Sequence, residues 1–173
     1  MQINHQEIGI GIIGCGRMGN LRSSISKTNS SVKYIGISDI DSKKAIQLGE
    51  RINADKVSVD NTDIINDENV HALIVSTSEP EHYKPVISAL ERGKPVLVEK
   101  PIALSVNEAE KMVEVAQKNN TSLHVGYTLR FNRHYLIGKQ QIIENKIGYL
   151  RLKAFNENSS KQLVKNISNF DFL

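Results

Sequence analysis

The chain has 173 residues, with 39% hydrophobic content, 24% charged content and a formal net charge of +3, which suits a globular protein of one complete domain and part of a second. Lysines and arginines spread among acidic residues argue against a nucleic-acid surface, and the lack of a long apolar run or signal sequence excludes a membrane span and predicts a cytoplasmic location. Cys15 is the only cysteine, which excludes an internal disulfide, and no cysteine pair or H-E-x-x-H motif offers a metal site.

The first predicted element is a buried strand that ends at Ile13 and runs into a glycine-rich turn. Gly14, Gly16 and Gly19 spell G-x-G-x-x-G, which gives a tight turn, a backbone open to a pyrophosphate and close packing of the next helix on the strand. The amides and the positive dipole end of that helix would hold phosphates, although such turns alone are weak evidence. The candidate cofactor-binding residues here are Gly14, Cys15, Gly16, Arg17, Met18 and Gly19.

A short helix over 20–27 precedes a second strand over 32–37, which ends just before Asp39. Asp39 lies 20 residues after Gly19, where a dinucleotide-binding fold places a carboxylate for the adenosine ribose hydroxyls. A carboxylate there repels a 2′-phosphate, which favours NAD, although two nearby lysines keep NADP open as an alternative. Capping of the following helix is the other role for such a residue, and we assign it to Asp41.

The next segments are a short strand over 57–59, a loop or irregular helix over 60–69 and a strand over 70–75. This last strand ends in a turn-forming cluster of candidate cofactor-binding residues, Ser76, Thr77, Ser78 and Glu79. His82 follows in the first turn of a helix. We interpret it either as a partly exposed helix residue or as a contact to a bound cofactor.

A short apolar strand over 95–98 leads into Glu99, Lys100 and Pro101. A lysine before proline is usually a solvated strand end, but Pro101 stiffens the backbone and biases Lys100 toward an extended conformation. In a cleft beside a dinucleotide, a lysine can have its pKa lowered enough to exchange a proton with a substrate hydroxyl. Lys100 is therefore the candidate catalytic residue, and Glu99 and Lys100 are candidate cofactor contacts.

Ser105 is predicted to cap a structural helix whose apolar stripe comprises Val106, Ala109, Met112, Val113 and Ala116. A strand over 122–127 and a helix from Phe131 to about residue 146 follow. Between them, Arg130 is a candidate ligand for a cofactor or substrate group, with a structural salt bridge as the alternative.

The chemically distinctive segments each follow the carboxyl end of a predicted strand, and in an open parallel sheet those ends line one crevice. Because helices alternate with the strands, we predict an α/β fold with a Rossmann-type, doubly wound, mostly parallel sheet and the start of a second α+β domain. The expected division is 1–127 for the dinucleotide-binding domain and 128–173 for a connecting helix and the start of a substrate and oligomerisation domain.

With the glycine turn, Glu99-Lys100-Pro101 and the segment 126–131, the chain resembles the Gfo/Idh/MocA oxidoreductase family from residue 8 to about residue 155. That family includes glucose-fructose oxidoreductase, inositol dehydrogenases and nucleotide-sugar dehydrogenases. The resemblance implies NAD(P) held by the glycine turn, Asp39 and the segment 76–82, with Lys100 near the nicotinamide. Hydride would pass between the cofactor and a sugar, nucleotide-sugar or cyclitol carbon.

Family members carry an Asp-x-x-x-His motif early in a second, largely antiparallel domain, which forms the substrate pocket. Here a strand is predicted over 150–155, the chain stops at Leu173, and Asp171 is not followed by a histidine. The resemblance therefore implies a gene product roughly twice as long, a homo-oligomeric dimer or tetramer, and a 173-residue segment whose own activity stays open. The alternatives are a non-catalytic NAD(P)-binding regulator or partner subunit, and a nucleotide-binding module that dimerises through its C-terminal strand.

Overall fold

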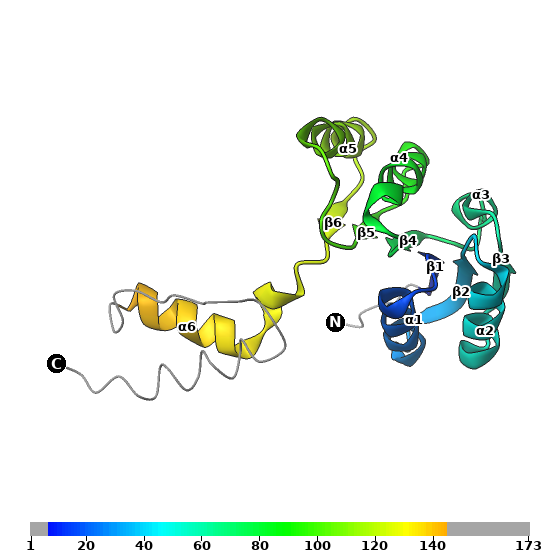
Figure 1. The fold of residues 1–173 in the computed structure, drawn as a ribbon, viewed down its shortest axis with the longest axis horizontal. Helices are drawn as coiled ribbons and strands as arrows, with labels where there is room; N and C mark the ends of the chain where they lie inside the picture. The colour runs from blue at the N-terminus through cyan, green and yellow to red at the C-terminus, as the bar shows by residue number, and fades with distance from the viewer. Residues whose placement is uncertain (1–6, 145–173) are drawn as a thin grey trace, which may run out of the picture. The chain divides into compact units, whose positions relative to one another are not determined.

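Hydrophobic strands and helices alternate along most of the chain, and six strands pair into a single parallel sheet (Figure 1). The computed structural model describes residues 7–144, divided between a first unit, Met1–Gly126, and a second unit, Tyr127–Leu173. The strands are β1 (Ile8–Ile13), β2 (Val32–Ser38), β3 (Lys56–Ser58), β4 (Ala72–Val75), β5 (Val96–Val98) and β6 (Leu123–Val125). Their order is β3-β2-β1-β4-β5-β6, which confirms the predicted Rossmann-type sheet.

Helices cover both faces of this sheet (Figure 1). In the first unit they are α1 (Arg17–Thr28), α2 (Ser42–Ile52), α3 (Asn61–Ile65), the 3₁₀ turn η1 (Glu79–Glu81), α4 (Tyr83–Glu91) and α5 (Val106–Lys118). The second unit contains the 3₁₀ turn η2 (Thr128–Phe131) and α6 (Arg133–Ile143). No helix among residues 7–144 is long and apolar enough to cross a membrane.

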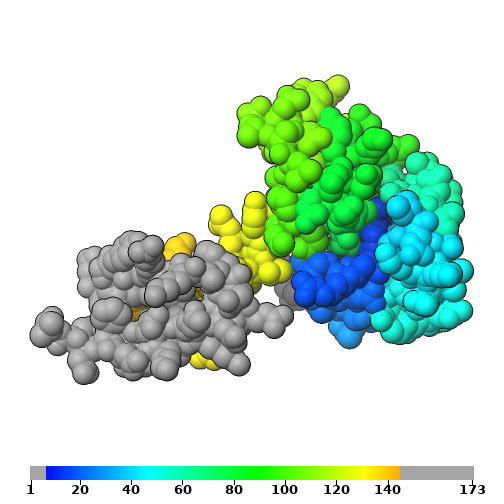
Figure 2. All heavy atoms as spheres, in the orientation of Figure 1, coloured from blue at the N-terminus to red at the C-terminus, as the bar shows by residue number. Residues whose placement is uncertain are grey.

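Two hydrophobic clusters hold the helices on the sheet, and they separate at β1, where consecutive side chains point to opposite faces. Ile12 packs in a cluster with β2 and α2, while Ile13 packs in a larger cluster with α3, α4 and α5. On the first of these faces α1, in blue, lies beside α2, in cyan, in Figure 2. The central strand β1 is thus buried on both sides, as its apolar sequence predicts.

Several element boundaries differ from the sequence predictions. The first helix begins at Arg17 and not at residue 20, because Gly16 is its N-cap. The segment 60–69 contains the short helix α3, and the fourth strand begins at Ala72 and not at residue 70.

The predicted stripe of α5 is wrong at two positions, because Val106 and Val113 are exposed while Val115 is buried with Met112 and Ala116. In the second unit, η2 precedes α6, which begins two residues after Phe131. The strand predicted over 150–155 lies outside the described residues.

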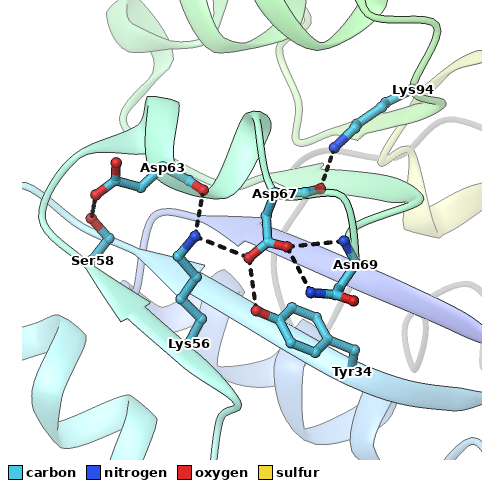
Figure 3. A network of polar contacts seen from close by, with 7 residues as sticks. All are labelled: Tyr34, Lys56, Ser58, Asp63, Asp67, Asn69 and Lys94. Atoms are coloured by element: carbon cyan, nitrogen blue, oxygen red, sulfur yellow. Dashed lines mark hydrogen bonds and ion pairs between the residues drawn. The ribbon is translucent and has the colours of Figure 1, made fainter.

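A polar network around Asp67 fastens the loop after α3 to the sheet (Figure 3). The Asp67 carboxylate accepts hydrogen bonds from the Tyr34 hydroxyl on β2 at 2.8 Å and from the Asn69 amide at 2.9 Å, and Lys56 of β3 lies 3.0 Å away. The backbone carbonyl of Asp67 accepts a further bond from Lys94 at 2.7 Å. Asp67 therefore connects two strands and the segment that leads into β5.

These contacts shift two pKa values in opposite directions. Burial alone would raise the pKa of Asp67, but the bonds from Tyr34 and Asn69 and the Lys56 ammonium outweigh it and lower that pKa to about 2. Burial, together with the neighbouring Asp67 carboxylate, raises the pKa of Tyr34 to about 12.

We predict that Asp67→Asn removes part of the acid sensitivity of the fold. Because the folded carboxyl has a depressed pKa, its charged form stabilises the protein fully above the unfolded pKa of about 4, and this stabilisation is lost as pH falls toward about 2. After allowance for screening by water, we expect about 1 kcal/mol. Urea unfolding of Asp67→Asn should show the lower stability near neutral pH and convergence with the unmodified chain in acid.

Asp63→Asn is the matched control, because the exposed Asp63 carboxylate accepts a hydrogen bond from the Ser58 hydroxyl and does not contact Asp67. This variant should keep the acid dependence of the unmodified chain. An unchanged acid dependence in Asp67→Asn would refute the assignment.

Candidate active site

A groove of about 620 Å³ lies at the carboxyl ends of the strands, where β1 and β4 diverge to connections on opposite sides. Such a divergence is the usual ligand site of an open α/β sheet, and the volume falls in the range of small-molecule pockets. The groove is lined by Gly14, Gly16, Arg17, Met18, Asp39, Ile40, Asp41, Lys44, Asn61, Ser76, Thr77, Ser78 and Glu81. The structure therefore brings three of the predicted segments, the glycine turn, Asp39 and residues 76–78, to one site.

The three glycines of the turn occupy distinct environments. Gly14 has φ +95°, and a Cβ there would lie 2.7 Å from the backbone of Ser76. A Cβ at Gly19 would overlap the carbonyl oxygen of Gly14, so only glycine lets α1 approach the end of β1 this closely. At Gly16 nothing lies within 4 Å of the Cβ position, which leaves the backbone open toward the groove.

Side-chain donors bind all three carbonyl groups of the turn. The Ser76 hydroxyl donates to the carbonyl of Gly14 at 2.9 Å, and the Asn20 amide donates to those of Cys15 and Gly16 at 2.7 and 2.8 Å. The first amides of α1 have no intrahelical partner, as at any helix start, and carry the positive end of the helix dipole. Because its carbonyl oxygens are already hydrogen-bonded and its amides are open, the turn is suited to binding an anion.

Asp39 joins the end of β2 to this turn. One carboxylate oxygen accepts from the Cys15 amide at 2.7 Å, and the other accepts from the Asp41 amide at 2.9 Å. Each oxygen has a second lone pair for a ligand hydroxyl. Asp41 caps α2 by accepting from the amides of Lys43 and Lys44, which confirms its predicted capping role, while the ribose role of Asp39 stays a prediction.

The thiol of Cys15 lies behind the turn, 3% exposed. Burial, reinforced by the Asp39 charge, raises the pKa of Cys15 to about 12. The thiol is therefore protonated at neutral pH and is not a nucleophile. Among residues 7–144, no group of three or more His, Cys, Asp or Glu side chains could hold a metal ion.

The opposite wall departs from prediction at two residues. Glu79 starts η1 and does not line the groove, whereas Glu81 does. His82 is 1% exposed, so its interpretation as a partly exposed residue is wrong. Its two ring nitrogens face the backbone carbonyls of Thr77 and Pro101, and its contact with a cofactor stays a prediction.

Glu99 also has a different environment from the one expected. It is 6% exposed and accepts from Nε and Nη2 of Arg22 on α1 at 2.8 and 2.6 Å. Its carboxylate packs over Gly126, where a Cβ would come within 2.9 Å of Glu99 Oε2. Glu99 is thus one half of a buried ion pair that fastens the end of β5 to α1, and its contact with a cofactor stays a prediction.

Lys100 follows Glu99 with an exposed side chain, and it precedes Pro101 through a cis peptide bond. It lies outside the residues that line the groove, two residues after the end of β5. Arg130 belongs to η2 in the second unit. The roles of both residues stay predictions.

Two groove residues in the connections after β2 and β3 were not predicted from the sequence. Ile40 is 87% exposed beside Asp39 despite its apolar side chain, and Asn61 accepts a hydrogen bond from the Ser38 hydroxyl at 2.9 Å. Both follow the carboxyl end of a strand, so the rule that identified Asp39 would have found them. Nothing in the sequence pointed to Arg22, because it does not follow a strand end and its partner Glu99 is 77 residues away.

Comparisons with known proteins agree with this geometry. The Gfo/Idh/MocA model, described as an oxidoreductase family with an NAD-binding Rossmann fold, matches residues 8–127. Myo-inositol 2-dehydrogenase of Thermotoga maritima is 30% identical over 139 residues, which cover 80% of this chain and 42% of the relative. Scyllo-inositol 2-dehydrogenase (NAD(+)) of Bacillus subtilis is 28% identical over 138 residues, which cover 79% of this chain and 40% of the relative. The chain therefore spans less than half the length of these relatives.

Solved structures show the same fold. A probable dehydrogenase from Thermotoga maritima superposes with a TM-score of 0.75 at 30% identity, covering 82% of this chain and 42% of that one. Scyllo-inositol dehydrogenase from Lactobacillus casei, solved with NAD(H) and scyllo-inositol, gives a TM-score of 0.76 at 26% identity. The match covers 83% of this chain and 43% of that one.

The Arg22–Glu99 pair yields a stability prediction. Arg22→Met leaves the buried Glu99 carboxylate without a cation, which should lower the free energy of unfolding by about 3 kcal/mol. Adding Glu99→Gln removes the unpaired charge and should recover part of that loss. Urea denaturation measures the stability of the single and the double variant. Arg92→Met is the control, because the Arg92 guanidinium bonds to Ser88, one turn earlier at the end of α4. Equal stability of the single and double variants would contradict this account.

Proposed function

We propose that this chain, which belongs to the Gfo/Idh/MocA oxidoreductase family, is the cofactor-binding part of an NAD-dependent dehydrogenase that acts on a cyclitol or sugar hydroxyl. The observation that carries the proposal is the groove, where the open amides at the start of α1 lie next to the Asp39 carboxylate. These two features match the pyrophosphate and the adenosine ribose of one dinucleotide.

The residues present fit such a cofactor. The amides from Gly16 onward would bind the pyrophosphate, and the Asp39 oxygens would accept from the ribose hydroxyls, as their second lone pairs allow. On the facing wall, the Thr77 hydroxyl is buried without a hydrogen-bond partner among the described residues. A polar group of a bound dinucleotide would supply that partner, because buried hydroxyls are rarely left unpaired.

Lys100 is the residue we assign to proton transfer. Oxidation of a secondary alcohol removes a hydride from carbon and a proton from oxygen, and bound NAD would supply the hydride acceptor. The Lys100 amine, in its neutral form, would take the hydroxyl proton. The exposed side chain at the carboxyl end of β5 can reach a substrate bound over this edge of the sheet.

The remaining assignments extend the same proposal. Residues from Tyr127 onward would begin the domain that binds substrate and forms a homodimer or homotetramer, with Arg130 holding a cofactor or substrate group. The protein would act in the cytoplasm. The position of Lys100 outside the groove lining favours, as the second candidate, a non-catalytic NAD(P)-binding regulator or partner subunit on the same fold.

Cofactor binding is tested by calorimetric titration of the chain with NAD⁺, NADH and NADP⁺. Gly16→Ala places a methyl group where the pyrophosphate approaches, and we expect about tenfold weaker NADH binding or more. Its folding stability should change by about 1 kcal/mol or less, since the Cβ position is empty. NADP⁺ should bind more weakly than NAD⁺, because Asp39 repels a 2′-phosphate.

Ser24→Ala, on the exposed side of α1, is the control and should leave NADH affinity unchanged. Absence of NAD(H) binding by the unmodified chain would overturn both candidate functions.

The catalytic assignment is tested in the protein expressed with whatever sequence its gene places after Leu173. Lys100→Met should lower kcat for NAD⁺-dependent oxidation of an inositol or sugar by about 10²-fold to 10⁴-fold, with NAD⁺ affinity little changed. Lys118→Met, at the exposed end of α5, is the matched control. Full activity of Lys100→Met would contradict a catalytic lysine, and NADH binding without turnover of any polyol or sugar would support the regulator.

A further inference from the structure

The buried imidazole of His82 joins two segments of the proposed site. Its Nδ1 lies 2.9 Å from the carbonyl oxygen of Pro101, and its Nε2 lies 3.2 Å from that of Thr77. Thr77 lines the groove, and Pro101 immediately follows Lys100. The ring therefore spans from the groove wall to the turn that presents the lysine.

Both partners of the ring are hydrogen-bond acceptors only, so each ring nitrogen must donate if both contacts are hydrogen bonds. A neutral imidazole has one N–H, and its other nitrogen would direct a lone pair at a carbonyl oxygen. The doubly protonated ring has an N–H for each carbonyl. Because the ring is 1% exposed, water cannot replace either contact, so the imidazole alone connects the two carbonyl groups.

We propose that His82 is the positioning residue for Lys100. It acts through the backbone, by holding the Pro101 carbonyl and the Thr77 carbonyl at a fixed separation. The role for Lys100 rests on the proposed function, but the bridge itself does not. Cofactor bound against Thr77 would then meet a lysine whose turn is already fixed to the same wall.

The hydrogen bonding of the His82 ring is tested by ¹⁵N NMR of the chain labelled at histidine. His71 serves as an internal reference, because its Nδ1 accepts a hydrogen bond from the Gly9 amide at 2.8 Å and is therefore unprotonated. We expect the His82 ring N–H to exchange with water far more slowly than that of the exposed His71 ring, because both His82 nitrogens face carbonyls in the interior. Equal exchange rates in the two rings would overturn the proposal.

The positioning role is tested with His82→Phe, which retains a planar ring and removes both donors. Lysine amines are labelled with ¹³C-methyl groups, and Lys100→Arg identifies the Lys100 signal. In the unmodified chain, NADH should shift this signal. In His82→Phe we expect that shift to fall by at least about half while NADH affinity falls by less than about tenfold. Retention of the full shift would overturn the proposal.

Two further variants separate positioning from a general effect on folding. His71→Phe also removes a hydrogen bond between an imidazole and the backbone. His71 precedes the amino end of β4, away from the carboxyl ends of the strands, so this variant should leave the Lys100 shift intact. His82→Gln can donate to one carbonyl and should restore part of the shift. It also replaces His82→Phe if that variant does not fold. Equal losses in His71→Phe and His82→Phe would count against the proposal.

Failure of the proposed function has a different signature. If the unmodified chain does not bind NADH, the proposed function fails, whereas the ring-nitrogen spectrum still decides the bridge. The backbone amide of Lys100, compared between the unmodified chain and His82→Phe without cofactor, then reports whether the turn is held. An unmoved amide would refute the positioning role.

Discussion

The close packing of α1 on the end of β1 is the constraint on which the rest of the site depends. It requires a hydrogen in place of a side chain at Gly19, because a Cβ would overlap the Gly14 carbonyl. This packing aims the start of α1 at the groove and brings Arg22, one turn further along, to Glu99 at the end of β5. A single close contact thus sets both the proposed anion cradle and the anchorage of the strand that precedes Lys100.

The sequence was sufficient to predict the fold because its signals are local. Apolar strands that alternate with helices indicate a parallel sheet, and glycine spacing together with Asp39 identifies the first two connections of a dinucleotide-binding fold. The start of α1 was misplaced by three residues for a local reason as well. Gly16 is an N-cap without a side chain, so no capping serine or aspartate marks the helix start.

The buried polar contacts could not be predicted, because nothing in the periodicity of a sequence pairs residues that are distant in the chain. Glu99 meets Arg22 across 77 residues, and His82 meets the Pro101 carbonyl, which belongs to another connection. Glu99 was interpreted as a ligand contact, and His82 either as a ligand contact or as a partly exposed helix residue. The structure shows a second use for such residues, which is to hold the connections together just beneath the surface that meets the ligand.

Lys100 illustrates why that second use matters. The residue before it is fixed to α1 through the Glu99 carboxylate, and the residue after it is fixed to the groove wall through its carbonyl. Its own side chain is exposed. For the proton transfer that we propose for Lys100, a fixed backbone position matters, since misplacement by about 1 Å can cost about 10²-fold in rate. The Arg22–Glu99 ion pair and the contact of His82 with the Pro101 carbonyl fix the backbone on both sides of Lys100 without using its amine.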